Sequence, residues 1–184
     1  MPNGAMFACT WPRYGRRGEV RAFPKGSGEA MSLLEGAVRK LFGAAGGGGG
    51  TSRVELMCRQ LGWSIADRKR GLLVLNFNDS VVGVRPVFTA NCDGDLVWVS
   101  THSHSVIPAR RVPPEVPSYL LRRNAEIKFG AWQASVNDRG TTLFALSYFV
   151  HADGLLAERF KFLCETIAVE ANSFDQLMHK AGLL

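Results

Sequence analysis

The fold class is decided by residues 72–102, which read LLVLNFNDSVVGVRPVFTANCDGDLVWVSTH. Apolar residues alternate over 72–78, and the Asn-Asp-Ser that ends this run is typical of a tight turn. Further strands are predicted over 81–90 and 96–102, because the Asp-Gly between them is a strong hairpin signal. Pro86 lacks a backbone donor and is therefore expected at a sheet edge or a bulge. The stretch predicts a three-stranded antiparallel meander.

A helix, a hairpin and a long helix are predicted after the meander. Residues 103–117 contain four prolines and no apolar period, which indicates a crossing loop. A helix is expected to begin at Ser118, with Asn124 suited to a left-handed conformation at or near its end. Strands are then predicted over 129–136 and 141–150, joined by an Asn-Asp-Arg-Gly turn.

The last predicted helix runs from about Leu155 to Lys180 and is long enough to cross a whole sheet or to contribute to a dimer. Its apolar stripe has helical spacing and contains Leu156, Phe160, Leu163, Ile167, Ala171, Phe174 and Leu177 or Met178. Upstream of the meander, Ser52 and Glu55 form a capping box that opens another helix, which ends near Gly62.

The element order is therefore helix, three-strand antiparallel meander, helix, β-hairpin and long C-terminal helix. Strands cluster instead of alternating with helices, so the fold class is α+β. The simplest packing is a single curved five-stranded sheet with helices mainly on one face.

Two regions are predicted along the 184 residues. Residues 1–51 are expected to be a disordered tail, because they are rich in Gly, Pro and Arg, although the apolar spacing of residues 32–42 predicts a short helix. The five glycines at 46–50 predict a flexible linker, since ordering them costs much backbone entropy. Residues 52–184 are the predicted folded domain.

Charge gives little support for nucleic-acid binding by the folded domain. The formal net charge is +6, but residues 1–52 hold seven basic and three acidic residues, which leaves 15 basic and 13 acidic residues in the remainder. The domain is thus nearly balanced, without the one-sided basic excess of a phosphate-binding face. We expect nucleic acid to be an unlikely partner.

The cysteines and the hydropathy pattern indicate a reduced, cytoplasmic protein. Cys9, Cys58, Cys92 and Cys164 form no C-x-x-C pair, and no secretory leader is recognised, so a disulfide framework is not expected. Cys58 and Cys164 lie in apolar helical patterns and are predicted to be small core residues. No apolar run approaches the length that spans a bilayer, so no membrane partner is expected.

A soft motif follows the Pro-rich segment. Residues 120–130 read LLRRNAEIKFG, in which a Leu-Leu helix ends in Asn and a Phe-Gly stretch enters the next strand. With the element order, this segment resembles the type III secretion chaperone-like superfamily, and more closely its branch of bacterial sensory transduction regulators. The resemblance covers about residues 53–181. It implies a protein-binding fold, commonly a homodimer, without a cofactor and without enzymatic activity.

Departures from that family narrow the expectation. Secretion chaperones are typically acidic, whereas this domain is about neutral to slightly basic. This nearly neutral charge favours an adaptor or regulator over a chaperone for one secreted effector.

Candidate site residues are few, and each has a plainer interpretation. His102 and His104 lie two apart and with Cys92 could suggest zinc, but no further ligand has a defined spacing and neighbouring serines indicate a solvated strand end. No Ser or Cys is paired with a base, so no nucleophilic site is predicted. His151 is expected to be a turn residue.

The residues predicted to contact a partner are two tryptophans and two arginine pairs. Trp98 and Trp132 have apolar neighbours in strand patterns and are interpreted first as packing residues and second as aromatic anchors of a protein interface. The arginine pairs could bind an acidic partner or phosphate, but a solvated surface is the plainer interpretation; they are Arg110, Arg111, Arg122 and Arg123.

The sequence therefore predicts a non-enzymatic protein-binding domain, acting as an adaptor, regulator or chaperone, that holds a partner segment on its sheet face or a sheet edge. The alternative is a nucleic-acid-associated regulatory protein that uses the arginine pairs and the basic tail. Salt distinguishes them, because phosphate binding weakens steeply as salt rises.

Overall fold

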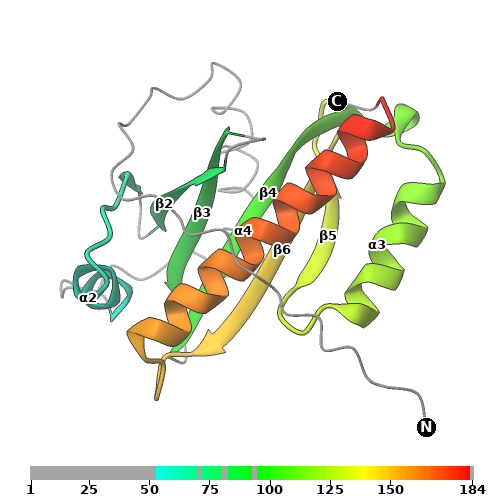
Figure 1. The fold of residues 1–184 in the computed structure, drawn as a ribbon. Helices are drawn as coiled ribbons and strands as arrows, with labels where there is room; N and C mark the ends of the chain where they lie inside the picture. The colour runs from blue at the N-terminus through cyan, green and yellow to red at the C-terminus, as the bar shows by residue number, and fades with distance from the viewer. Residues whose placement is uncertain (1–52, 70–71, 80–82, 93–94, 183–184) are drawn as a thin grey trace, which may run out of the picture.

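The computed structural model describes residues 53–69, 72–79, 83–92 and 95–182, so the predicted tail, its short helix and the glycine linker lie outside the described residues. In these ranges three α-helices and one short 3-10 turn accompany a six-stranded sheet (Figure 1). The elements are α2 (Arg53–Gln60), β1 (Asp67–Lys69), β2 (Leu72–Asp79), β3 (Gly83–Cys92), β4 (Leu96–Pro108), η1 (Ala109–Arg111), α3 (Glu115–Glu126), β5 (Ala131–Val136), β6 (Thr141–His151) and α4 (Ala157–Lys180).

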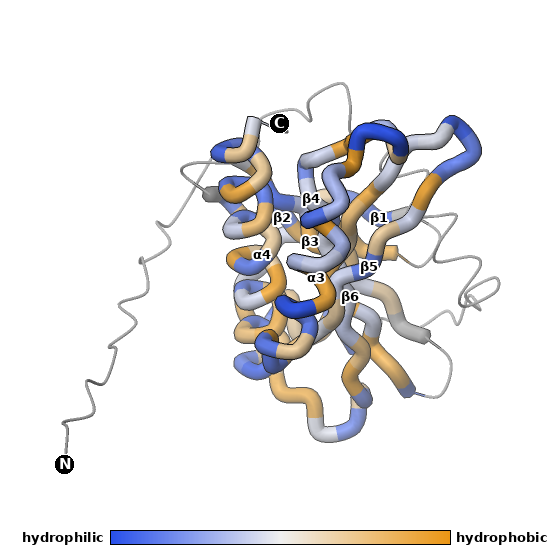
Figure 2. Tube along the Cα trace, turned by 90° about the vertical axis from the view of Figure 1, so that its right-hand side faces the viewer, coloured by the Kyte–Doolittle hydropathy of each residue, from blue (hydrophilic) through white to orange (hydrophobic). Residues whose placement is uncertain are grey.

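The α+β class and the order of the predicted elements are confirmed. The sheet is antiparallel throughout, in the order β1-β2-β3-β4-β6-β5, so the meander and the hairpin join through β4 and β6. The long helix α4 lies diagonally across the sheet, and Figure 2 shows it as a layer to one side of the strands. Among the described residues, no helix is both long and apolar enough to cross a membrane.

The main core lies between the helices and one face of the sheet. The buried apolar residues of α2, α3 and α4 all belong to this cluster, together with the apolar residues of β2, β3, β4 and β6 that point the same way. The predicted stripe of α4 is confirmed at Phe160, Leu163 and Ile167, all at most 1% exposed. Leu156, which precedes the helix, is exposed, and at the C-terminal end Met178 is buried whereas Leu177 is exposed.

Four expectations about local structure are wrong. The sheet has a sixth strand, β1, whose three residues Asp-Arg-Lys carry no apolar signal. Pro86 lies in the interior strand β3, although β3 pairs with β4 only as far as Phe88 opposite Ser100. The third strand does not end at His102: β4 continues through residues 103–108, which were expected to be loop.

The fourth concerns α3. This helix begins at Glu115, three residues before the expected Ser118, and Asn124 lies inside it. In the described ranges the one non-glycine residue with positive φ is Asp95, so Asn124 is not left-handed.

Candidate functional site

The sheet has a second face that none of the described helices covers. Residues directly opposite one another in an antiparallel pair point to the same face. Following the register from Phe88 also places Asn76, Pro86, Leu96, Ala131, Gln133 and Ser135 on this side. We call its central part the helix-free face: Leu72, Val74, Phe88, Ala90, Trp98, Ser100, His102, Val106, Leu143, Ala145, Ser147 and Phe149.

The helix-free face is apolar at its centre. Six of its residues form a separate buried cluster, each at most 5% exposed: Leu72, Val74, Phe88, Ala90, Trp98 and Leu143. Two further apolar side chains stand at its rim, Val106 at 51% and Phe149 at 38% exposure. The central side chains are thus already out of water, and Val106 and Phe149 are the large apolar side chains of this set that present exposed surface to another apolar surface.

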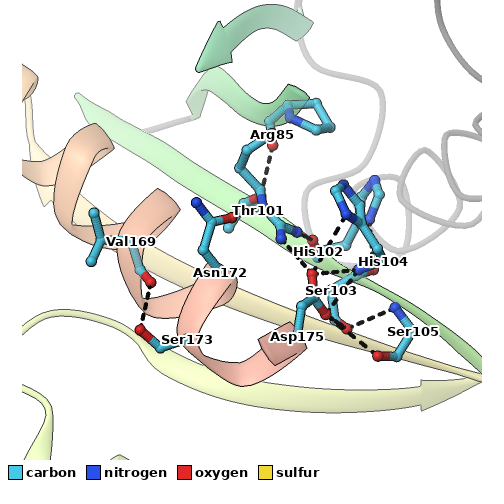
Figure 3. Close-up of polar contacts among 11 residues, drawn as sticks. Arg85, Thr101, His102, Ser103, His104, Ser105, Val169, Asn172, Ser173 and Asp175 are labelled. Atoms are coloured by element: carbon cyan, nitrogen blue, oxygen red, sulfur yellow. Dashed lines mark hydrogen bonds and ion pairs between the residues drawn. The ribbon is translucent and has the colours of Figure 1, made fainter. Parts of the chain in front are cut away.

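On the opposite face a buried polar cluster attaches α4 to the sheet (Figure 3). The Arg85 side chain comes from β3, is 0% exposed and forms an ion pair with Asp175 of α4. Its Nε also donates to Oδ1 of Asn172 at 2.7 Å, and its Nη1 donates to the carbonyl oxygen of His102. A buried guanidinium needs such acceptors, because a charge taken from water without partners is costly.

Asp175 is the acceptor on which the cluster converges. Besides Arg85, its carboxylate accepts from the hydroxyl groups of Ser103 and Ser105 and from the backbone N–H of His104, at 3.0 Å to Oδ2. These three residues form a bulge, since the register shifts between His102 and Val106 and the three face Phe144 alone on β6. The carboxylate thus satisfies a backbone donor that the ladder leaves without a partner.

The arrangement does not match a catalytic triad. The Ser103 hydroxyl donates to Asp175 and not to a histidine, and Nδ1 of His104 lies 3.7 Å from Oδ2 of Asp175. Burial lowers the pKa of His102 to about 4 and also lowers the pKa of His104, with a further lowering from the nearby Arg85 charge. Both imidazoles are therefore neutral near pH 7, and the cluster serves to position β4 beneath α4.

Among the described residues, no group of three or more His, Cys, Asp or Glu side chains is placed to hold a metal ion. The ring of His102 stacks on Phe88 at 5.5 Å, and the two histidine rings are 6.5 Å apart. The expected solvated strand end is wrong, because Ser103 and Ser105 are both 0% exposed.

The two tryptophans lie on different faces of the sheet. Trp98 is 3% exposed at the centre of the helix-free face, opposite Phe149 of β6. Trp132 is 5% exposed in the main core, with its ring centroid 4.7 Å from that of Phe174. Packing, the first of the two interpretations, accounts for Trp132, while Trp98 combines packing with a place on the candidate interface. Partner binding through either tryptophan stays a prediction.

The arginine pairs do not form one site. Arg110 and Arg111 are exposed in η1, and Arg122 is exposed on α3. Arg123 instead donates twice to Glu170 of α4, with both contacts at 2.7 Å, and once to Glu126 at 3.0 Å. Its charge is already compensated by two carboxylates, and their hydrogen bonds raise the pKa of the guanidinium. Contact of these arginines with a partner stays a prediction.

The LLRRNAEIKFG segment docks α3 against its neighbours. Leu120 enters the main core and Arg123 reaches α4. The amide of Asn124 binds both backbone groups of Trp132, accepting from its N–H at 2.6 Å and donating to its carbonyl oxygen at 3.0 Å. Gly130 has φ +86°, and a Cβ there would lie 3.0 Å from the Ser147 carbonyl oxygen, so a larger residue at this position would be strained.

The same contact closes part of a sheet edge. β5 is an edge strand, and the Asn124 amide occupies the outward-facing backbone groups of Trp132 as a neighbouring strand would. The alternation of the ladder leaves only Ala134 and Val136 with backbone groups pointing outward. The edge strand at the other side, β1, is three residues long. β1 pairs with β2 only at residues 72–74, so residues 75–79 of β2 have no strand neighbour on that side and form the longest free edge among the described strands.

The two described free cysteines, Cys58 and Cys164, are buried in the main core. Burial raises the pKa of the Cys58 thiol to about 11 and raises that of Cys164 as well. Thiols held protonated in this way are poor nucleophiles. The prediction that they are core residues is confirmed.

The sequence reasoning missed Arg85, Asn172 and Asp175. Arg85 lies in phase with Val87 and Thr89 on the core-facing side of a strand, where a charge is out of place. Asn172 and Asp175 are three apart on the stripe of α4 that carries Ala171 and Phe174. These polar residues within the apolar face of β3 and within the apolar stripe of α4 could have indicated a buried polar cluster. That Arg85 pairs with Asp175, 90 residues later, has no local signal in the sequence.

Comparisons with known proteins bear on the fold. No family model and no curated protein matches the sequence. Among solved structures, YbjN, a proposed transcription regulator from E. coli, has a TM-score of 0.53 and 17% identity over 72% of this chain and 93% of that chain. The Yersinia pestis type III secretion chaperone SycH, solved in complex with a fragment of YscM2, has a TM-score of 0.47 and 12% identity over 67% of this chain and 97% of that chain.

A chain of the HopA1–SchA chaperone–effector complex is also similar, with a TM-score of 0.45 and 9% identity over 65% of this chain and 88% of that chain. YbjN is the one of these three with a TM-score above 0.5. At these identities the likeness is one of fold, and the YbjN match carries it.

Proposed function

We propose that this chain is a non-enzymatic protein-binding domain, an adaptor, regulator or chaperone, that holds an apolar segment of a protein partner on its helix-free face. The observation that supports this most directly is the cluster around Phe88 and Trp98, which lies on the sheet face away from the described helices. Aromatic residues at the centre of an apolar patch are typical anchors of protein interfaces.

The face is a better candidate than the sheet edges. Strand addition requires a row of outward-facing backbone groups. The Asn124 amide occupies those of Trp132, which leaves the groups of Ala134 and Val136 on that edge. The apolar face spans four strands and needs no free edge.

The polar cluster gives no support for catalysis. A general base must reach the proton that it removes, and a nucleophile must be activated by such a base. Asp175 is engaged by Arg85, two serine hydroxyls and a backbone N–H. The imidazole of His102 is 7% exposed and its pKa is lowered by burial, which suits packing on Phe88.

A cytoplasmic homodimer is part of this proposal, because the family that the sequence resembles commonly forms one. Light scattering on the full chain gives the solution mass, and a mass near the monomer value at tens of micromolar would remove the dimer from the proposal. The alternative, nucleic-acid association, would use the exposed Arg110, Arg111 and Arg122, but Arg123 is compensated by Glu170 and Glu126.

The test uses peptides selected from a random displayed library against the full chain, with affinities measured by calorimetry. Val106→Asp places a charge at the exposed rim of the helix-free face and is expected to weaken selected peptides at least about tenfold. Leu177→Asp is the matched control, since Leu177 is 42% exposed on α4.

Equal losses in both variants, or none in either, would exclude the helix-free face as the binding surface. Salt separates the two candidate functions. An apolar contact should keep its affinity between 50 and 200 mM salt, whereas six to ten phosphate contacts would lose roughly 10³–10⁵ in affinity over that range.

A further inference from the structure

The low exposure at the centre of the helix-free face requires a cover. Trp98 is 3% exposed and Phe88 is 1% exposed, as buried as residues of the main core. Side chains stand nearly perpendicular to a sheet, so a face without a second layer leaves them open to water. Yet every buried apolar residue of α2, α3 and α4 in the main core belongs to the other side of the sheet, and the second cluster contains strand residues alone.

We propose that residues 32–42 of this same chain form the cover, as an amphipathic helix packed on the helix-free face in cis. This segment lies outside the described residues, and its sequence SLLEGAVRKLF is apolar at positions that share one side of a helix. A helix with one apolar side is not stable alone at this length and needs a surface to pack on.

The length of the connecting chain fits this placement. Ten residues, 43–52, join the segment to the start of α2, and five of them are consecutive glycines. A Gly-rich chain of this length has an end-to-end distance of about 16–19 Å and a fully extended reach of about 33–36 Å. Passing from one layer beside a sheet to the layer on its far side requires roughly 20 Å, because adjacent layers are about 10 Å apart.

The starting point of that connection is also favourable. Glu55, in the first turn of α2, forms an ion pair with Arg68 of β1 at 3.1 Å. Because β1 is the edge strand, the chain that precedes α2 begins beside a margin of the sheet. It therefore needs to cross only three residues of strand at that edge to reach β2 and β3, which carry Leu72, Val74 and Phe88.

The cis cover has a regulatory consequence. A partner segment that binds the helix-free face must displace residues 32–42, whose tether gives them a high effective concentration. The chain would then bind only segments that make better contacts with the face than its own segment does. This consequence rests on the proposed function, but the docking of residues 32–42 does not, because it involves no partner.

Paramagnetic relaxation enhancement tests the docking directly. In the full chain, Arg39→Cys carries a nitroxide on the polar side of the segment, with Cys9→Ser and Cys92→Ser removing two other thiols, while Cys58 and Cys164 are buried. The expected result is broadening of the amide signals of the helix-free face, including Phe88, Trp98 and Leu143. Amides on the outer side of α4 should stay sharp.

Two variants with the same change of charge separate apolar docking from electrostatic attraction. Leu34→Asp with Leu41→Asp alters the apolar side of the segment and should abolish the broadening. The control variant combines Arg21→Ala with Lys40→Ala. It also makes the chain two charges more negative, but it leaves the apolar side of the segment intact and should preserve the broadening.

A mixed sample identifies the source of the cover. Spin-labelled chain without ¹⁵N is added to ¹⁵N-labelled chain without a spin label, so that broadening arises only between molecules. Broadening in the mixed sample at the level of the single sample would mean that a second copy supplies the segment, which overturns the cis proposal. Sharp face signals in both samples would overturn the docking itself. Neither outcome depends on peptide binding, which is measured separately.

Discussion

Replacement of Asp175 by Asn tests whether the buried polar cluster holds α4 on the sheet. The substitution keeps the size of the side chain and one acceptor oxygen, so it makes no cavity. Among the described residues it removes the one carboxylate that contacts the guanidinium of Arg85, which is 0% exposed. Arg85 would keep only neutral acceptors, the amide oxygen of Asn172 and the carbonyl oxygen of His102.

The magnitude follows from this geometry. Unit charges about 4 Å apart attract by about 4 kcal/mol at an effective dielectric constant of about 20. Removing one partner of a buried ion pair destabilises proteins by about 3–5 kcal/mol, because an uncompensated charge is left behind. We expect Asp175→Asn to lower the free energy of unfolding by about 4 kcal/mol, against a total of about 5–15 kcal/mol for a domain.

Urea unfolding of the full chain, followed by circular dichroism, measures this loss. With a slope of about 2 kcal/mol per molar, the midpoint should fall by about 2 M. The matched control is Glu170→Gln, which weakens the half-exposed pair with Arg123 and should cost about 1 kcal/mol or less. Should the control variant lose as much as Asp175→Asn, burial would not be the cause.

A double-mutant cycle removes the remaining ambiguity. Arg85→Met removes the other charge, and in combination with Asp175→Asn it leaves no charge unpaired at this contact. The loss of unfolding free energy in the double variant should then be smaller than the sum of the two single losses by about 2–3 kcal/mol, as for other groups in direct contact. Strict additivity, or a cost below about 1 kcal/mol for Asp175→Asn alone, would refute the role given to the ion pair.

Two further predictions follow from His102 and Asn124. The pKa of His102 is lowered to about 4, mainly by burial and also by the Arg85 charge, against the raising effects of the Ser103 carbonyl and Asp175. The neutral form therefore stabilises the fold fully above pH 6.5, and about 2–3 kcal/mol of stability is lost as the pH falls from 6.5 towards 4. Urea unfolding at pH 7 and pH 4.5 measures how much unfolding free energy each variant loses on acidification. The loss should be smaller for His102→Gln than for His179→Gln, and equal losses would refute this. Asn124→Ala removes two hydrogen bonds to the backbone of Trp132, and we expect a loss of about 1–3 kcal/mol and increased self-association by light scattering, with both absent in Arg122→Ala.

Local periodicity made most of the fold predictable. The alternation over 72–78 and the stripe of α4 each bury one face, and burial of that kind leaves a direct pattern in the sequence. The hairpin between β5 and β6 was predictable because Asn137 accepts from two backbone N–H groups in the turn and Gly140 has φ +71°. Such signals act over a few residues.

The misses occur where distant residues decide the local structure. Residues 103–105 are Ser-His-Ser and look like an exposed end, yet Ser103 and Ser105 are buried by their bonds to Asp175. A polar residue can continue a buried strand only if its partners are supplied, and here they come from a helix 70 residues later. The candidate interface was predictable in type, as a sheet face, but its position depends on which face α4 covers.

The bulge links the two faces of the sheet. His102 and Ser103 are neighbours in β4, yet the first stacks on Phe88 of the helix-free face and the second donates to Asp175 on the α4 side. The ion pair with Arg85 therefore fixes the backbone that carries His102 and, after the shift in register, the exposed Val106. A face that accepts different apolar segments needs a rigid backbone beneath adaptable side chains, since a moving backbone would add an ordering cost to each contact. The buried cluster supplies that rigidity from the side of the sheet that α4 covers.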